Sequence, residues 1–279
     1  MNSIYISDKQ ISQIRQIPHF QKSIYANIDI SSTLEYYKKR FIKHSPLFTE
    51  NSIANLAVAD IGCGYGWLAM AIALFTDVKK IIAIDYDEER LKAASQISEI
   101  LGLKSSITWL VGSVTDIPLD SMSVDICYCI EVIEHVNRNP DSIRELCRIT
   151  RNYLLITTPN LYAPIIGHDT RLPFCHWLPI PLRKIYARVF LKSYSEHNKF
   201  WSPVSLMSNM VGFKRISTFL HYSSLRDYLS QFPYYSPYSK KMVYKPSLTT
   251  CLYMQFASKV LGRNSHWFLP NLAGLFKRV

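Results

Sequence analysis

Apolar, β-rich runs alternate with segments of helical character between residues 56 and 158, and this alternation limits the possible folds more than any other feature. The runs are LAVADI (56–61), KIIAID (80–85), SITWLV (106–111), VDICYCI (124–130) and YLLITT (153–158). The helical segments lie near 67–76, 87–101 and 140–150. Continuously apolar strands that alternate with helices indicate a parallel sheet covered on both faces. We therefore expect an α/β, doubly wound, mostly parallel sheet of the Rossmann-like type.

The residues beyond 160 differ in composition from the part before them. Prolines interrupt 164–181, a helix is expected over 203–211, and 213–219 and 267–279 read as further strands, which makes seven. Of the 32 Lys and Arg residues, 17 lie in 151–279, together with only 3 of the 21 Asp and Glu residues. Such an excess indicates an anionic partner, whether a phosphorylated or lipid-linked substrate, a membrane surface or nucleic acid. A basic surface that is merely solvated is the alternative.

No Gly/Ser linker or internal repeat divides the chain. We expect one domain over 51–279, capped by helical structure from 1–50, with 159–265 contributing acceptor-site loops and a basic insertion. No run of eighteen apolar residues occurs and the first residues lack the apolar core of a secretory signal, so the expected compartment is the cytoplasm. The six cysteines follow no metal-site or disulfide-framework spacing and are expected to be reduced.

A glycine-rich turn follows the first strand. The run ends in Asp60, and glycines stand at 62, 64 and 66. Glycine tolerates positive φ and lets a ligand approach the backbone, and the carboxyl end of a strand is where open α/β sheets bind ligands. Asp85 closes the second strand, where its carboxylate can accept both hydroxyls of a ribose. The turn and this acid together predict a ligand that contains a nucleoside.

The spacing of the motifs resembles the class I S-adenosylmethionine-dependent methyltransferases. The third glycine comes one residue earlier than in the dinucleotide pattern G-x-G-x-x-G, which argues against a dehydrogenase, and an acid stands just before the turn. GSVTDIP (112–118) is similar to the adenine-binding segment of the family, and VDICYCIEVIEHV (124–136) to its fourth strand and following loop. These motifs occur in family order, and the resemblance covers residues 56–136.

The resemblance implies S-adenosylmethionine as the cofactor. Asp60 would orient the turn and the amino-acid end of the cofactor, and Asp85 would bind the ribose. The other implied contacts come from the backbone of Gly62, Cys63, Gly64 and Gly66, from Tyr86, Ser113 and Val114 around the adenine, and from the carbonyl of Ile130. Many relatives have an acid where Ser113 stands, which weakens the expectation of a side-chain contact to the adenine amine there.

The loop after the fourth strand resembles that of the ubiquinone-type O-methyltransferases and holds the first catalytic candidates, Glu131 and His135. Imidazole titrates near neutral pH and can take a proton from a hydroxyl acceptor. With Glu134 these residues could instead orient the loop or hold a divalent metal, and we assign no metal site. His176 is the third candidate, in a loop with His168, Arg171 and Trp177 that suits an anionic acceptor or, alternatively, packs a proline-rich crossover. His197 is a weaker candidate, and Tyr37 and Arg40 could close over the cofactor carboxylate or face solvent.

The expected function is methyl transfer to a small-molecule acceptor, at a hydroxyl of a polar, anionic or lipid-linked compound. Alternatives are an RNA methyltransferase or a non-catalytic protein that binds S-adenosylmethionine. Amino-methylating enzymes of nucleic-acid bases carry an N/D-P-P-Y/F element where this chain has Ile130-Glu-Val-Ile, so we do not expect nucleic acid as a partner. Residues 223–265 mix Tyr, Phe, Leu and Lys as interfacial segments do, which leaves peripheral membrane contact or a helical cap as alternatives.

Overall fold

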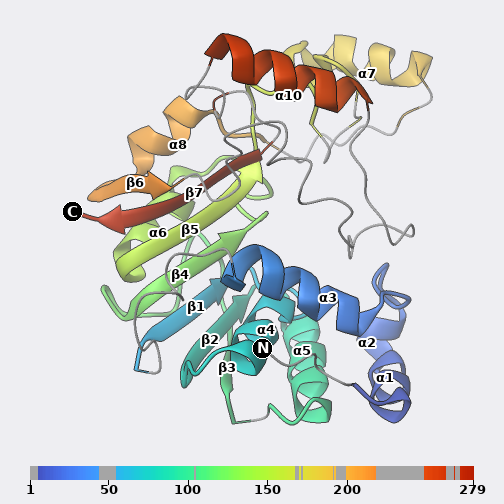
Figure 1. The fold of residues 1–279 in the computed structure, drawn as a ribbon, viewed down its shortest axis with the longest axis vertical. Coiled ribbons are helices and arrows are strands. Elements are labelled where there is room, and N and C mark those ends of the chain that lie inside the picture. Colours follow the sequence, from blue (N-terminus) through green and yellow to red (C-terminus); the bar gives the residue numbers. More distant parts are fainter. Residues whose placement is uncertain are drawn as a thin grey trace.

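A seven-stranded sheet in the order β3-β2-β1-β4-β5-β7-β6 forms the centre of the molecule (Figure 1). The computed structural model describes residues 6–43, 55–103, 105–166, 170, 172–190, 192, 199–217, 248–261, 267 and 271–279. The strands are β1 (Ala57–Ile61), β2 (Lys80–Asp85), β3 (Ile107–Val111), β4 (Val124–Ile130), β5 (Thr150–Pro159), β6 (Phe213–Ser217) and β7 (Asn271–Arg278). Neighbouring strands from β3 to β5 are parallel, and β7 runs antiparallel to β5 and β6. The expected α/β, mostly parallel sheet is confirmed.

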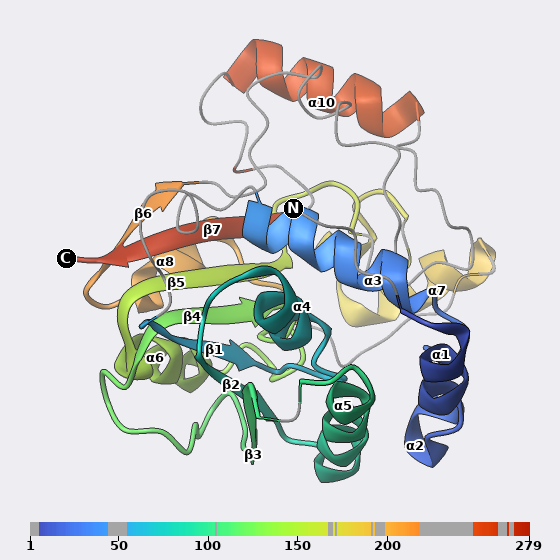
Figure 2. The ribbon, with the colours of Figure 1, turned by 60° about the horizontal axis from the view of Figure 1, so that its bottom comes forward.

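Helices cover both faces of this sheet, as Figure 2 shows. The N-terminal helices α1 (Asp8–Arg15), α2 (Pro18–Gln21) and α3 (Ile30–Tyr37) pack with α4 (Trp67–Phe75) and α5 (Glu88–Ile100) into one core. The second core contains α6 (Pro140–Ile149) and α8 (Pro203–Asn209). Successive residues of β2 alternate between these cores, with Ile81 in the first and Ile82 in the second. This alternation explains why the strands are apolar throughout, since each face is buried.

The observed elements differ from the expected ones mainly at their ends. Within the expected helical cap of 1–50, helix α3 begins at Ile30 and ends at Tyr37, after which a π-helical turn covers Lys38–Lys43. Strand β5 begins three residues before the expected run, because Thr150 already pairs with Val124 of β4. Within the segment 267–279 the described strand is Asn271–Arg278, and the helix expected over 203–211 ends at Asn209.

Two helices lie beyond the sheet in the C-terminal half, at the top of Figure 1. They are α7 (Ile180–Val189), which follows the short 3-10 helix Cys175–Trp177, and α10 (Leu248–Leu261). Of the tyrosine-rich segment 223–265, only the part that forms α10 lies within the described residues. In the part of the chain that the structure describes, no helix is long and apolar enough to cross a membrane.

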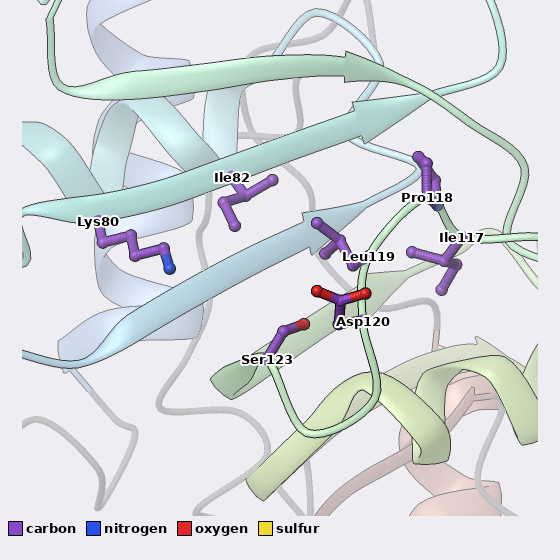
Figure 3. A pocket seen from close by; sticks show the side chains of 7 residues that line it. All are labelled: Lys80, Ile82, Ile117, Pro118, Leu119, Asp120 and Ser123. Carbon is purple, nitrogen blue, oxygen red and sulfur yellow. The ribbon is translucent and has the colours of Figure 1, made fainter.

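The connection between β3 and β4 is a loop without a helix in residues 112–123. It is fixed to α6 by Arg148, which donates to the carbonyls of Ile117 and Leu119, and by Glu145, which accepts from the Ile117 N–H at 2.9 Å. A cavity of about 450 Å³ lies beneath this loop (Figure 3). Its lining is Lys80, Ile82, Ile117, Pro118, Leu119, Asp120 and Ser123. Because Lys80 and Ser123 stand at the amino-terminal ends of β2 and β4, the cavity is distant from the glycine turn.

Candidate functional site

The glycine turn after β1 has left-handed backbone at three positions, with φ of 72° at Gly62, 58° at Gly64 and 73° at Gly66. Two of these glycines are required by contacts within the chain. A Cβ at Gly62 would lie 2.4 Å from Cγ2 of Val132, and one at Gly66 would lie 2.3 Å from Cη2 of Trp109. These positions therefore hold the turn against the β4 loop and against β3.

Gly64 differs from the other two because its Cα faces open space. A Cβ there would meet only Cδ of Arg90, at 4.0 Å. The left-handed backbone by itself favours glycine at this position, and the open space beside it would also admit a ligand against the backbone. Gly64 is therefore the glycine of the turn that leaves the most space for the nucleoside-bearing ligand expected from the sequence.

The carboxylate of Asp85 links this turn to β2. Its Oδ2 accepts the Gly64 N–H at 2.8 Å, and its Oδ1 accepts the Asp87 N–H at 3.0 Å. Asp85 is 3% exposed, so these bonds hold its side chain in one orientation. Each carboxylate oxygen has a second lone pair, which leaves room for a hydroxyl donor on each. The carboxylate thus keeps acceptor capacity for the ribose hydroxyls that the resemblance assigns to it.

Asp60 is buried at the end of β1 and accepts a backbone hydrogen bond from Ala69. Burial and, to a smaller extent, the neighbouring Asp85 together raise the pKa of this carboxyl to about 7, against the lowering effect of the Ala69 hydrogen bond. Oδ2 of Asp60 has no hydrogen-bond partner among the described residues. A buried carboxylate oxygen without a donor suits a cationic ligand group, such as the amino group of the expected cofactor.

Two side chains beside the turn come from the start of α5. Tyr86 is 73% exposed, so it does not pack into the start of this helix. Arg90 lies 3.2 Å from Oδ2 of Asp87 and 3.7 Å from Oδ1 of Asp85, and its guanidinium lies 5.9 Å from the centre of the Tyr86 ring. The sequence motifs do not identify Arg90 as a residue beside the site, since its proximity to Gly64 and Asp85 arises only in the folded chain.

The expected adenine segment follows β3 next to this site. Ser113 lies within hydrogen-bond distance of Thr115, with 2.8 Å between the two hydroxyl oxygens, so its side chain is used within the loop. Val114 is buried against the second core, which leaves its backbone for a ligand contact. Ile130 is the last residue of β4 and pairs with Thr157 of β5. The structure thus places these residues at the same edge as the glycine turn.

The loop after β4 brings a buried carboxylate next to an exposed imidazole. Glu134 is fully buried and accepts the Thr158 hydroxyl at 3.0 Å. His135 has a side chain that is 53% exposed, and its Nε2 lies 3.9 Å from Oε1 of Glu134. Glu131 begins the loop with a left-handed backbone, φ 56°. Among the residues that the structure describes, no group of three His, Cys, Asp or Glu side chains could hold a metal ion.

His176 has surroundings that fit a packing role. It is 2% exposed, its Nε2 lies 3.1 Å from the Leu161 carbonyl, and its ring contacts Phe200 edge to face. Burial lowers its pKa, with a smaller effect of the same sign from Arg183. The structure therefore favours the crossover-packing alternative for His176 over catalysis. His168, Arg171 and His197 lie outside the described residues.

The N-terminal helices reach the glycine turn through Tyr65. Its hydroxyl lies 3.0 Å from Nδ1 of His19, and its ring packs edge to face on Phe20 and Tyr25. Tyr37, for which closing over the cofactor carboxylate and facing solvent were the alternatives, is 8% exposed and packs in the first core, so it does not face solvent; the side chain of Arg40 lies outside the described residues. In the sequence, the only indication of this contact between Tyr65 and the N-terminal helices is that an aromatic residue stands inside the glycine motif.

Residues 59–153 match a family described as "Methyltransferase domain". The chain is 30% identical to a probable S-adenosylmethionine-dependent methyltransferase of Mycobacterium tuberculosis over 120 residues. This match covers 42% of this chain and 41% of that protein. Over 131 residues it is 27% identical to a ubiquinone biosynthesis O-methyltransferase of Rickettsia prowazekii, which covers 47% of this chain and 50% of that protein. The chain thus spans about half or less of the length of these curated relatives.

Two solved structures share the fold. A geranyl diphosphate C-methyltransferase from Streptomyces coelicolor A3(2) aligns with a TM-score of 0.51 and 13% identity, over 89% of this chain and 79% of that chain. Magnesium protoporphyrin IX methyltransferase from Synechocystis PCC 6803 aligns with a TM-score of 0.50 and 14% identity, over 98% of this chain and 95% of that chain. At these identities the likeness concerns the fold alone.

Proposed function

We propose that this chain, whose residues 59–153 match a methyltransferase family and whose motifs resemble the class I S-adenosylmethionine-dependent enzymes, transfers the methyl group of S-adenosylmethionine to a small-molecule acceptor. The acceptor group that we propose is a hydroxyl of a polar, anionic or lipid-linked compound. The observation that supports the proposal most is the geometry of Gly64 and Asp85, where an open backbone position lies beside a fixed, buried carboxylate.

The residues of the turn fit the cofactor by their chemistry. We assign the ribose hydroxyls to Asp85, the amino group to Asp60 together with the carbonyl of Ile130, and the adenine to Tyr86 and the backbone of Val114. Gly62, Cys63 and Gly66 complete the turn, and Ser113 shapes the adenine loop. The exposed ring of Tyr86 gives a face on which a base can stack.

S-Adenosylmethionine supplies a methyl group that its sulfonium already activates. The protein must therefore position the acceptor, exclude water and accept the proton of the acceptor hydroxyl. We assign the proton to the imidazole of His135, which is exposed enough to reach a bound acceptor. Glu134 orients this ring and compensates its charge when the proton is taken up, and the Thr158 hydroxyl fixes Glu134 in turn.

The relatives do not decide the acceptor atom. One of them is named for transfer to oxygen, and an ajmaline N-methyltransferase of Rauvolfia serpentina is named for transfer to nitrogen. Our preference for a hydroxyl rests on His135, since an amine acceptor needs no strong base to become nucleophilic. Incubation with labelled S-adenosylmethionine and a cell extract, followed by identification of the labelled product, tests the acceptor class directly.

Calorimetry tests the cofactor. The chain should bind S-adenosylhomocysteine and release no heat with NAD, and Asp85→Ala should weaken the first interaction at least about tenfold, since a charged hydrogen bond is worth about 1.5–3 kcal/mol. Asp77→Ala is the matched control, because Asp77 is an exposed acid just before the opposite end of β2. Equal binding by the wild type and Asp85→Ala, or no binding by the wild type, would contradict the proposal.

A further inference from the structure

Helix α7 carries apolar side chains on the face that points away from the protein. Ala187 is its buried residue, at 2% exposure. Leu182, Ile185 and Val189 follow one another at helical spacing, and they are 50%, 61% and 70% exposed. At 100° per residue these three side chains lie within a narrow stripe, on the opposite side of the helix from Ala187. A globular helix normally has the reverse arrangement.

Basic residues lie along one side of this stripe. Lys184 and Arg188 are exposed on α7, and Lys192 is exposed just after it. No Asp or Glu occurs between Leu172 and Ser195 in the sequence. The helix therefore presents an apolar stripe bordered by positive charge alone, which is the pattern of helices that lie in the interface of an anionic bilayer.

Helix α10 repeats the arrangement and lies at the same end of the molecule in Figure 1, although Figure 2 shows that it is not beside α7. Its exposed apolar residues are Leu248, Leu252, Phe256 and Val260, each four residues after the previous one. The helix contains one Lys and no acid. Two helices that both expose apolar stripes without acidic residues suit one partner better than scattered exposure would.

We propose that α7, together with α10, docks this protein on an anionic lipid surface. Charge decides between the possible occupants. A second copy of the chain would bring its own basic residues against Lys184 and Arg188, whereas an anionic bilayer compensates them. The proposal deepens the proposed function and rests on it, since a lipid-linked acceptor would be presented at such a surface.

Vesicle sedimentation of the full chain tests the docking. The protein should pellet with vesicles of phosphatidylcholine mixed with phosphatidylglycerol, should stay in solution with phosphatidylcholine alone, and should be released by salt. The double variant I185Q/V189Q should reduce the partition coefficient at least about tenfold, because it removes two side chains that enter the interface. K184E/R188E should reduce it by a similar factor.

Two control variants change comparable residues elsewhere. Val211→Gln replaces a 71% exposed apolar residue between α8 and β6, and Lys79→Glu replaces an exposed cation before β2. Both should bind vesicles like the wild type. The proposal is overturned if the wild type ignores anionic vesicles at low salt, or if the controls lose as much binding as the α7 variants. It is also overturned if light scattering finds a dimer that I185Q/V189Q dissociates, since a second copy would then occupy the surface.

Cofactor binding separates this failure from that of the proposed function. I185Q/V189Q and K184E/R188E should bind S-adenosylhomocysteine with wild-type affinity in calorimetry, which also shows that they are folded. If the wild type binds vesicles but not S-adenosylhomocysteine, the docking proposal stands and the proposed cofactor is rejected. If it binds S-adenosylhomocysteine but not vesicles, only the docking proposal is rejected.

Discussion

The backbone N–H of Gly64 donates a hydrogen bond of 2.8 Å to Oδ2 of Asp85. The two residues stand 21 positions apart in the sequence, Gly64 on the loop after β1 and Asp85 at the end of the neighbouring parallel strand β2. This bond makes one rigid unit of the glycine turn and the acid, and it is supported by the Gly62 and Cys63 N–H groups, which both donate to the carbonyl of Ile84. A ligand that contacts both loops therefore meets a preformed surface.

Gly64→Ala should separate ligand binding from stability. The left-handed backbone will cost about 1 kcal/mol of unfolding free energy, but no clash with the chain follows, because only Arg90 lies within 4.0 Å of the new methyl group. The affinity for S-adenosylhomocysteine should fall roughly tenfold or more, since the methyl group occupies the ligand side of the turn. Gly102→Ala is the control, as Gly102 has φ 78° and open space around it. Equal affinity in the two variants would reject this role of Gly64.

Gly66→Ala should destabilise the fold through Trp109. The added methyl group would overlap the indole ring, so we expect a loss of at least about 2 kcal/mol in urea unfolding. In a Trp109→Leu background the same change should cost only the left-handed strain of about 1 kcal/mol. A double-mutant cycle measures this coupling. If Gly66→Ala costs the same in both backgrounds, the contact with Trp109 does not explain the glycine.

Asp60 makes the stability of the ligand-free chain depend on pH. Its pKa is raised from the model-peptide value of 3.8 to about 7, so the unfolded chain releases this proton at lower pH than the folded one. The stabilisation that protonated Asp60 gives the fold is fully present below pH 4. As pH rises to about 7 it is lost, and the free energy of unfolding falls by up to about 1.4 kcal/mol per pH unit. Asp60→Asn should therefore become more stable relative to the wild type between pH 4 and 7. A constant difference in urea unfolding across this range would contradict the raised pKa.

Asp125 should contribute more to stability than a surface ion pair does. It accepts the Ala57 N–H at 2.9 Å and pairs with Arg151 at 2.8 Å, which joins the amino-terminal ends of β1, β4 and β5. Asp125→Ala leaves a buried N–H without an acceptor, so thermal or urea unfolding should show a loss of about 2–4 kcal/mol. Asp141→Ala, which removes an exposed pair with Arg144, should cost less than about 1 kcal/mol. Similar losses in the two variants would refute this ranking.

His135→Ala should lower the initial rate of methyl incorporation at least about tenfold, because the acceptor hydroxyl loses its base. The affinity for S-adenosylhomocysteine should stay unchanged, since His135 lies outside the assigned cofactor contacts. His135→Gln distinguishes the base from a residue that merely orients the loop. Glutamine keeps a hydrogen-bonding side chain but cannot take up the proton, so it should be as slow as Ala. Recovery of the rate in His135→Gln would favour the orienting role.

The fold followed from the sequence because the signal for each strand is local. The run KIIAID at 80–85 forms β2 with the expected bounds, and Cys127 and Cys129 are buried in the same core, as their spacing on one strand predicts. The ends of the elements were predicted less accurately, since the π-helical turn after α3 and the pairing of Thr150 at the start of β5 depend on neighbouring elements. The roles of the individual site residues remain predictions for the experiments above.

The sequence by itself determined the order of strands and helices, the place of the glycine turn and the acid that follows it. Only the tertiary structure decided which glycine of the turn is packed and which is open, because Gly62 and Gly66 contact Val132 and Trp109, residues that are remote in the chain. It also decided that the apolar stripe of α7 points outward, since an amphipathic pattern states that two faces differ but not which one the protein covers. Local periodicity is encoded within a few residues, whereas burial is a property of the assembled molecule.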